Sequence, residues 1–244
     1  MLKLGDLPLG DRPRVAVAIR DGVRREDVDA VLADGADVLE LRIDQFASRD
    51  GNHVVDEIGR FSGIPLLGTI RNPAEGGAWA GSEGDRAALF VQILPHVDAL
   101  DIELSAREIR EEVISAARSA GKLVIGSYHD FDSTPSYEAL AATAEDGNAA
   151  GVHIVKIGAT CQDNGDLRRL ARFTLEYAAQ GLITIGMGPA GLPSRVLFPA
   201  LGSLLTYTFL GEPTAPGQLN CGQLLAYLRG LYLEASEENP CSKR

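Results

Sequence analysis

Residues 151–159 read GVHIVKIGA, a run of β-branched and small residues with one lysine, Lys156, near its middle. Side chains alternate between the two faces of a strand, so Val152, Ile154 and Lys156 are predicted to share one face. A lysine on a buried strand loses much of its hydration, which favours the neutral amine, and a neutral amine can attack a carbonyl. A lysine near a strand end can instead extend to solvent or pair with a carboxylate. The rest of the sequence must decide between these two interpretations.

Apolar runs of strand length recur along the chain and alternate with longer amphipathic segments. Strands are predicted at residues 15–19, 38–41, 66–70, 99–102, 123–126, 152–157, 182–185 and 204–207. Helices are predicted at 25–33, 85–93, 106–119, 136–145, 166–179 and 218–233. Glycines such as Gly147 are expected to end helices, and Ser105 and Thr134–Pro135 are expected to begin them.

This alternation has no linker or change of composition, so it predicts α/β architecture, a single (β/α)8 TIM-barrel domain over residues 1–244. A doubly wound parallel sheet is the alternative. Residues 1–13 are expected to form an N-terminal extension that closes the bottom of the barrel. The polar tail, residues 236–244, is expected to be frayed.

Composition limits the possible partners. The formal net charge of −11 argues against nucleic acid or an anionic membrane as a partner. No apolar run approaches the roughly 20 residues of a membrane span, and the first residues lack the apolar core of a signal peptide. The cysteines, Cys161, Cys221 and Cys241, are odd in number and far apart, which is typical of reduced thiols in a cytoplasmic protein. The expected partner is a small molecule.

Active-site residues of a (β/α)8 barrel lie at the C-terminal ends of its strands. Reading those ends in chain order collects Glu40, Arg42, Arg71, Asp101, Glu103, His129, Asp130, Lys156 and Met187, with Arg195 in the segment that follows. The N-terminal ends of the same strands show no comparable gathering of ionisable groups. One end of the barrel is therefore predicted to hold the site.

Two acidic pairs in this set allow alternatives. Glu40 and Arg42 in ELRID share a face and can pair, with Asp44 completing the network; the same spacing fits a strand end stabilised by its own salt bridge. Asp101 and Glu103 have the spacing to hold Mg²⁺. Because cationic side chains are expected nearby, neutralising them is the favoured role, and no metal site is predicted.

Acid–base chemistry points to His129 in SYHDF, the one histidine expected at the mouth of the barrel. Glu75, on the loop RNPAEGG, can orient and charge-stabilise a histidine, or it can be a solvated loop carboxylate. The forked guanidinium of Arg195 matches a carboxylate. Residues 211–218, GEPTAPGQ, are rich in Pro and Gly and form either a lid over the site or an inert surface loop.

Seven short motifs occur in order between residues 15 and 233: ELRID, R-x-x-x-E-G-G, D-x-E, S-Y-H-D-F with Thr134–Pro135, V-K-I, M-G-x-x-G-x-x-S-R and A-P-G-Q. In this order they resemble the type I 3-dehydroquinate dehydratases, the Schiff-base hydro-lyases of the shikimate pathway to chorismate and the aromatic amino acids. The resemblance implies a TIM barrel, often a homodimer, that converts 3-dehydroquinate without a metal or organic cofactor.

The resemblance also implies residue roles. Lys156 would form the imine, His129 would shuttle the proton and Glu75 would be its partner. The substrate site would be lined by Glu40, Arg42, Arg71, Met187, Arg195, Tyr207, Thr214 and Gln218, with Arg195 on the substrate carboxylate. Departures from the family pattern are Ala18, Gln45, Gly158 and Tyr207, the last standing where phenylalanine is frequent. The alternatives are a class I Schiff-base aldolase, which usually needs a phosphate site, and a barrel that binds without catalysis.

Overall fold

A computed structural model describes residues 2–212 and 217–233 of the chain. The predicted frayed tail at 236–244 lies outside the described residues. Residues 213–216 of the predicted lid, which include Thr214, also lie outside them.

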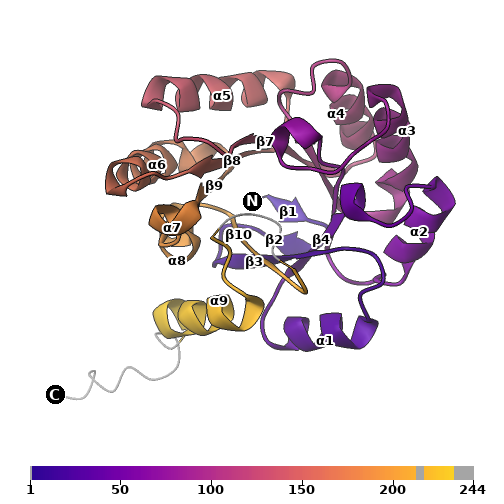
Figure 1. Ribbon diagram of the computed structural model, residues 1–244, viewed down its shortest axis with the longest axis horizontal. Helices are drawn as coiled ribbons and strands as arrows, with labels where there is room; N and C mark the ends of the chain where they lie inside the picture. Colours follow the sequence, from indigo (N-terminus) through magenta and orange to yellow (C-terminus); the bar gives the residue numbers. More distant parts are fainter. Residues whose placement is uncertain (1, 213–216, 234–244) are drawn as a thin grey trace.

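The described chain forms one eight-stranded parallel sheet curled into a barrel, with helices around its outside (Figure 1). The strands of the barrel are β3 Arg14–Ile19, β4 Val38–Arg42, β5 Leu66–Thr69, β6 Ala99–Glu103, β7 Leu123–Asp130, β8 Ile154–Thr160, β9 Leu182–Met187 and β10 Leu205–Phe209. Their order in the sheet is β10-β3-β4-β5-β6-β7-β8-β9, so sequence neighbours pair from β3 to β9 and the last strand pairs with the first. The Leu204 amide donates to the Leu182 carbonyl at 2.9 Å where β9 and β10 meet. The predicted TIM barrel is confirmed, because a doubly wound sheet would reverse its order at a switch point.

Helices follow most strands and cover the barrel. They are α1 Arg25–Ala33, α2 Gly51–Gly59, α3 Glu83–Ile93, α4 Arg110–Ser119, α5 Tyr137–Ala150, α6 Asn164–Tyr177, α7 Gly188–Gly191, α8 Ser194–Leu197 and α9 Cys221–Leu228, which continues as a π-helix, Arg229–Leu233. The outer core lies between the helices and the outward faces of the strands. Among the described residues, no helix has the length and apolar character required to cross a bilayer.

A short hairpin packs against the N-terminal end of the barrel. Its strands, β1 Lys3–Leu4 and β2 Leu7–Pro8, are antiparallel. Leu4 and Leu9 are buried against apolar side chains that fill the barrel interior at the beginnings of the strands, including Ala16. The interior is therefore apolar at this end, and polar groups concentrate at the other.

Several predicted boundaries are wrong. Gly147 does not end its helix: α5 continues to Ala150, and Gly151 takes the positive φ of +83° that a helix end favours in glycine. Ser136, rather than Thr134–Pro135, caps that helix by accepting from an amide. Strand β8 begins at Ile154, so Val152 precedes the alternation and packs in the outer core instead of sharing the face of Lys156.

Candidate active site

The C-terminal ends of the strands enclose a cavity that gathers nearly all of the predicted site residues. It is lined by Glu40, Arg42, Arg71, Glu75, Gly76, His129, Phe131, Lys156, Gly158, Ile185, Met187, Arg195, Tyr207 and Gln218. Neighbouring strands are in register so that Lys156 lies beside Ser127, and Ser127 beside Glu103. The structure therefore brings together every predicted catalytic and substrate-lining residue that it describes. Asp130, which the strand ends also suggested, does not line the cavity and accepts instead from the Asp132 and Ser133 amides. Thr214 lies in the part of the chain that it does not describe.

Lys156 projects from β8 and is only 4% exposed. Its Nζ lies 2.9 Å from Asp101 Oδ2 and 3.8 Å from Glu40 Oε1. The same nitrogen lies 4.2 Å from the centre of the Tyr207 ring. Two carboxylates and an aromatic face thus surround a buried amine.

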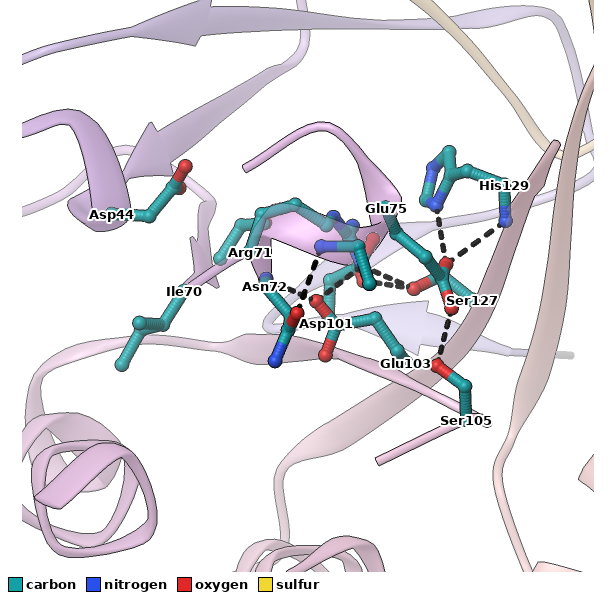
Figure 2. A network of polar contacts seen from close by, with 12 residues as sticks. Asp44, Ile70, Arg71, Asn72, Glu75, Asp101, Glu103, Ser105, Ser127 and His129 are labelled. Atoms are coloured by element: carbon teal, nitrogen blue, oxygen red, sulfur yellow. Dashed lines mark hydrogen bonds and ion pairs between the residues drawn. The ribbon is translucent and has the colours of Figure 1, made fainter. Parts of the chain in front are cut away.

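Asp101 is the centre of a buried polar network, part of which appears in Figure 2. It accepts hydrogen bonds of 2.6 Å from Arg71 Nη2 and from Ser127 Oγ, besides its contact with Lys156. Burial acts to raise the pKa of Asp101, but Arg71 and Lys156 outweigh it and hold that pKa well below its usual range. Asp101 is therefore an anion in the free site.

Glu103 holds the loop that leads to Glu75. It accepts from the Asn72 amide at 2.7 Å and from Arg86 Nη1 at 2.7 Å, and lies 3.3 Å from Arg71. Both acidic residues of D-x-E, Asp101 and Glu103, thus pair with cationic side chains, as the sequence predicts. Within residues 2–212 and 217–233, no cluster of three or more His, Cys, Asp or Glu side chains is arranged to hold a metal ion.

Glu75 and His129 form a buried pair. Glu75 ends the 3₁₀-helix Pro73–Glu75, and its Oε2 lies 3.0 Å from His129 Nδ1 and accepts from the His129 amide at 2.9 Å. Its other oxygen accepts from the Ser105 hydroxyl. An ionised carboxylate at Nδ1 fixes the proton on that nitrogen and leaves Nε2 as the basic atom. The alternative of a solvated loop carboxylate is wrong, since Glu75 is 6% exposed.

Burial shifts the pKa values of Glu75 and His129 in opposite directions. It raises the pKa of Glu75 to about 7. It also lowers the pKa of His129 well below its usual value, and the positive charges of Arg71 and Lys156 lower it further. Both shifts follow from disfavouring the charged form of a desolvated group. His129 is therefore neutral at neutral pH, as a general base must be.

The predicted pairing of Glu40 with Arg42 is wrong. Arg42 donates to Asp44 through Nε at 3.0 Å and Nη2 at 2.9 Å, while Glu40 accepts from Thr69 Oγ1 at 2.9 Å. The reason is that β4 turns directly into the 3₁₀-helix Ile43–Gln45, which places Asp44 beside the guanidinium. Arg42 remains on the cavity wall.

Arg195 comes from α8 and is 2% exposed. Its Nε donates to the Gly217 carbonyl at 2.9 Å and its Nη1 to the Tyr207 carbonyl at 3.2 Å. Burial lowers the pKa of Arg195 to about 10, which leaves it cationic at neutral pH. These two backbone carbonyls fix the orientation of the Arg195 guanidinium, which lies on the cavity wall.

Three residues of the network were not singled out from the sequence as part of a site. Ser105 was expected to begin a helix, but α4 begins at Arg110 and Ser105 binds Glu75 instead. Ser127 precedes His129 by two residues, so both lie on one face of β7. This spacing could have identified Ser127 from the sequence as a residue of the site. Arg86 is fully buried on α3, and nothing in an amphipathic helix distinguishes a buried arginine from a solvated one.

The fold and the site define an enzyme of the (β/α)8-barrel class, with a buried lysine that lines the same cavity as a carboxylate-bound histidine. Within that class, the chain belongs to the type I 3-dehydroquinase family, whose model matches residues 18–234.

Relatives and solved structures agree with this assignment. The 3-dehydroquinate dehydratase of Methanosarcina acetivorans is 42% identical over 76% of this chain and 81% of its own length. That of Methanocella arvoryzae is 36% identical over 91% of this chain and 98% of its own. The crystal structure of the type I enzyme from Clostridium difficile with covalently modified comenic acid has a TM-score of 0.85 at 27% identity, covering 96% of this chain and 98% of that one.

Proposed function

We propose that this chain dehydrates 3-dehydroquinate to 3-dehydroshikimate through an imine on Lys156, with His129 as the proton shuttle and Glu75 as its partner. The observation that carries the assignment of roles is that Lys156 and the His129–Glu75 pair face one cavity. Membership of the type I family supports the reaction. The aldolase and the non-catalytic barrel lose support, because the family and its named relatives are dehydratases.

The first half of the reaction joins substrate to enzyme. The ammonium of Lys156 first gives up one proton, and the neutral amine adds to the C3 ketone. The carbonyl oxygen then leaves as water, with one proton from the amine and with the proton that Lys156 gave up, and a C=N bond with a cationic nitrogen remains. Asp101, which lies 2.9 Å from Nζ in the free site, stabilises that cation. Attack begins only after Lys156 has lost its proton, because only the neutral amine has a free electron pair.

The second half moves one proton and expels one water. The iminium withdraws electrons and makes the C2 protons acidic, and His129 Nε2 removes one of them. The electron pair of the C2–H bond forms an enamine, which expels the C1 hydroxyl as His129 returns the proton to that oxygen. Hydrolysis of the conjugated iminium then frees 3-dehydroshikimate and restores Lys156.

One experiment tests this assignment directly. Incubation with 3-dehydroquinate should produce the absorbance of a conjugated enone at the same rate with and without a chelator. Borohydride added during turnover should reduce the imine and leave one stable adduct per chain, which peptide mapping should place in residues 151–159. An adduct without the enone would contradict dehydration, and an enone without an adduct would contradict the imine.

The Glu75–His129 pair predicts a pH dependence. The turnover number reports groups of the enzyme–substrate complex, in which Lys156 is already an imine. Because the pKa of Glu75 is raised to about 7, kcat should fall as the pH drops through about 7 and the pair takes up a proton. In Glu75→Gln that group is gone, and the remaining His129 has a pKa well below its usual 6.5. We expect the acid limb of Glu75→Gln to move below pH 6.5 and kcat to fall by about ten-fold. An acid limb that stays near pH 7 would contradict this assignment.

Arg195 is proposed to bind the substrate carboxylate with both arms of its guanidinium. Arg195→Lys keeps a positive charge but loses the fork and the Nε contact to Gly217. We expect KM to rise by about ten-fold or more, with a smaller loss in kcat, as measured by steady-state kinetics on the same substrate. Arg12→Lys is a matched control, since Arg12 pairs with Asp37 at the opposite end of the barrel. Equal KM values for Arg195→Lys and the parent would exclude the bidentate contact.

We further propose that the chain works as a homodimer in the cytoplasm. Leu197 on α8 and Leu231 after α9 are 47% and 63% exposed, which supports a contact on this side of the barrel. Cys161 and Cys221 are buried free thiols, as expected in a reducing compartment. Light scattering during gel filtration measures the mass, and charged substitutions at Leu197 and Leu231 should halve it.

A further inference from the structure

The two oxygens of the Glu75 carboxylate have different surroundings. Oε2 lies against His129, at 3.0 Å from Nδ1 and 2.9 Å from the amide nitrogen. Oε1 accepts a hydrogen bond from the hydroxyl of Ser105, as Figure 2 shows. Within residues 2–212 and 217–233, this hydroxyl is the sole hydrogen-bond donor to Oε1. A serine that does not line the cavity thus binds the oxygen that His129 leaves free.

The fold holds Ser105 in place although the residue is exposed. Ser105 directly follows Leu104, which is 4% exposed and whose amide donates to the Ser127 carbonyl at 2.8 Å. The Leu104 carbonyl accepts from Arg110 Nη1 at 2.7 Å, and the same guanidinium pairs with Asp146 at 2.6 Å. The turn between β6 and α4 is therefore anchored at both strand and helix, and it presents the serine hydroxyl to Glu75.

This hydroxyl favours the ionised form of Glu75. Burial, the largest effect, raises the pKa of Glu75, and the negative charge of Glu103 on β6 adds to it. The Ser105 hydroxyl, the positive charge of Arg71 after β5 and the His129 amide on β7 lower the same pKa. A donated hydrogen bond has this effect because an ionised carboxylate accepts it more strongly than a protonated carboxyl does.

The charge on Glu75 decides which nitrogen of His129 is basic. The ionised carboxylate accepts from Nδ1–H and leaves the electron pair of Nε2 free. A protonated carboxyl would donate to Nδ1 instead, and the neutral ring would then carry its proton on Nε2, which could not accept another. A contact at Oε1 therefore acts on the nitrogen that faces the reaction.

We propose that Ser105 is a positioning residue, whose hydroxyl holds Glu75 in the orientation and charge that keep His129 Nε2 free to accept a proton. The inference rests on the proposed roles of His129 and Glu75. Because Ser105 does not line the cavity, it should act on turnover through Glu75 and leave substrate binding unchanged.

Ser105→Ala removes the hydroxyl and keeps the backbone of the turn. The readout is the pH profile of kcat, taken from the enone absorbance at saturating 3-dehydroquinate. Without the hydrogen bond the pKa of Glu75 should rise from about 7, and the acid limb should move up by about one pH unit. We expect kcat to be about five-fold below the parent near pH 7 and within about two-fold of it near pH 9, with KM nearly unchanged. Tyr128, the other titratable group on β7 whose charge Glu75 affects, has a pKa raised above its usual 10 and stays neutral over this range.

Three further variants separate the charge of Glu75 from a loss of structure. Ser105→Thr keeps the hydroxyl and should restore the acid limb of the parent. Glu75→Gln has no carboxylate to ionise, so adding Ser105→Ala to it should not move the acid limb. Ser119→Ala changes an exposed serine on α4 and should have the pH profile of the parent.

The outcomes distinguish this inference from the proposed function. If the parent has no acid limb near pH 7, the proposed Glu75–His129 pair fails and the role of Ser105 fails with it. If the parent has the limb and Ser105→Ala leaves it in place, the role of Ser105 is overturned and the proposed function stands. A kcat that falls equally at every pH would also overturn it, since a loss of structure alone has that effect. A shift that persists in the Glu75→Gln protein would overturn it by assigning the limb to another group.

Discussion

Lys156→Ala is expected to abolish both turnover and borohydride trapping, because it removes the nitrogen on which the imine forms. The described residues contain two other lysines, Lys3 and Lys122, and neither lies on a barrel strand. Neither can take its place in the cavity. Residual dehydration should fall to the level of a protein that only binds substrate, with intact mass showing no adduct.

The substitution should leave the fold intact. Removing the ammonium takes one cationic partner from Asp101, but Arg71 still donates to that carboxylate at 2.6 Å. Lys156→Met is a second variant that fills more of the vacated volume. Lys122→Ala is the matched control and should trap and turn over like the parent. Continued trapping in a folded Lys156→Ala protein would remove Lys156 from the mechanism.

His129→Ala is expected to lower kcat by at least ~10²-fold, the usual scale for the loss of a general acid–base group. The structure strengthens this expectation, because the Glu75 contact at 3.0 Å leaves Nε2 as the proton acceptor. Imine formation should survive, since Lys156 and Asp101 are untouched. Borohydride should therefore still produce the adduct in a protein that makes the enone very slowly.

His53→Ala is the appropriate control for His129→Ala. His53 pairs with Asp21 at 3.2 Å on the outside of the barrel and does not line the cavity. It should retain the activity of the parent. A His129→Ala protein with near-parental kcat would show that another group moves the proton.

The barrel was predictable from the sequence because its signal is local and repeated. A buried parallel strand needs a short apolar run, and an amphipathic helix needs a longer period, so alternation along the chain indicates the βα units directly. The same logic placed Glu40, Arg71, His129 and Lys156 at one end, since parallel strands all end on the same side of a barrel. Motif order then indicated the family.

Helix ends were less predictable because the competing signals differ by small energies. Gly147 resembles a helix stop, yet α5 continues past it to Gly151, where the chain turns into β8. A glycine within a helix costs only about 1 kcal/mol relative to alanine. Packing of α5 against the barrel exceeds that cost, and packing is not visible in a local pattern.

The sequence by itself determined the barrel, the end that carries the chemistry, and the residue types available there. Only the tertiary structure decided which charges meet: Arg42 with Asp44 rather than Glu40, Ser105 with Glu75, and Lys156 with Asp101 and the face of Tyr207. Spacing along a strand fixes the face on which a side chain lies, but its partners come from other strands, whose relative register the barrel sets. The electrostatics of a buried site depend on those distances and on the exclusion of water, so they arise only once the barrel has closed.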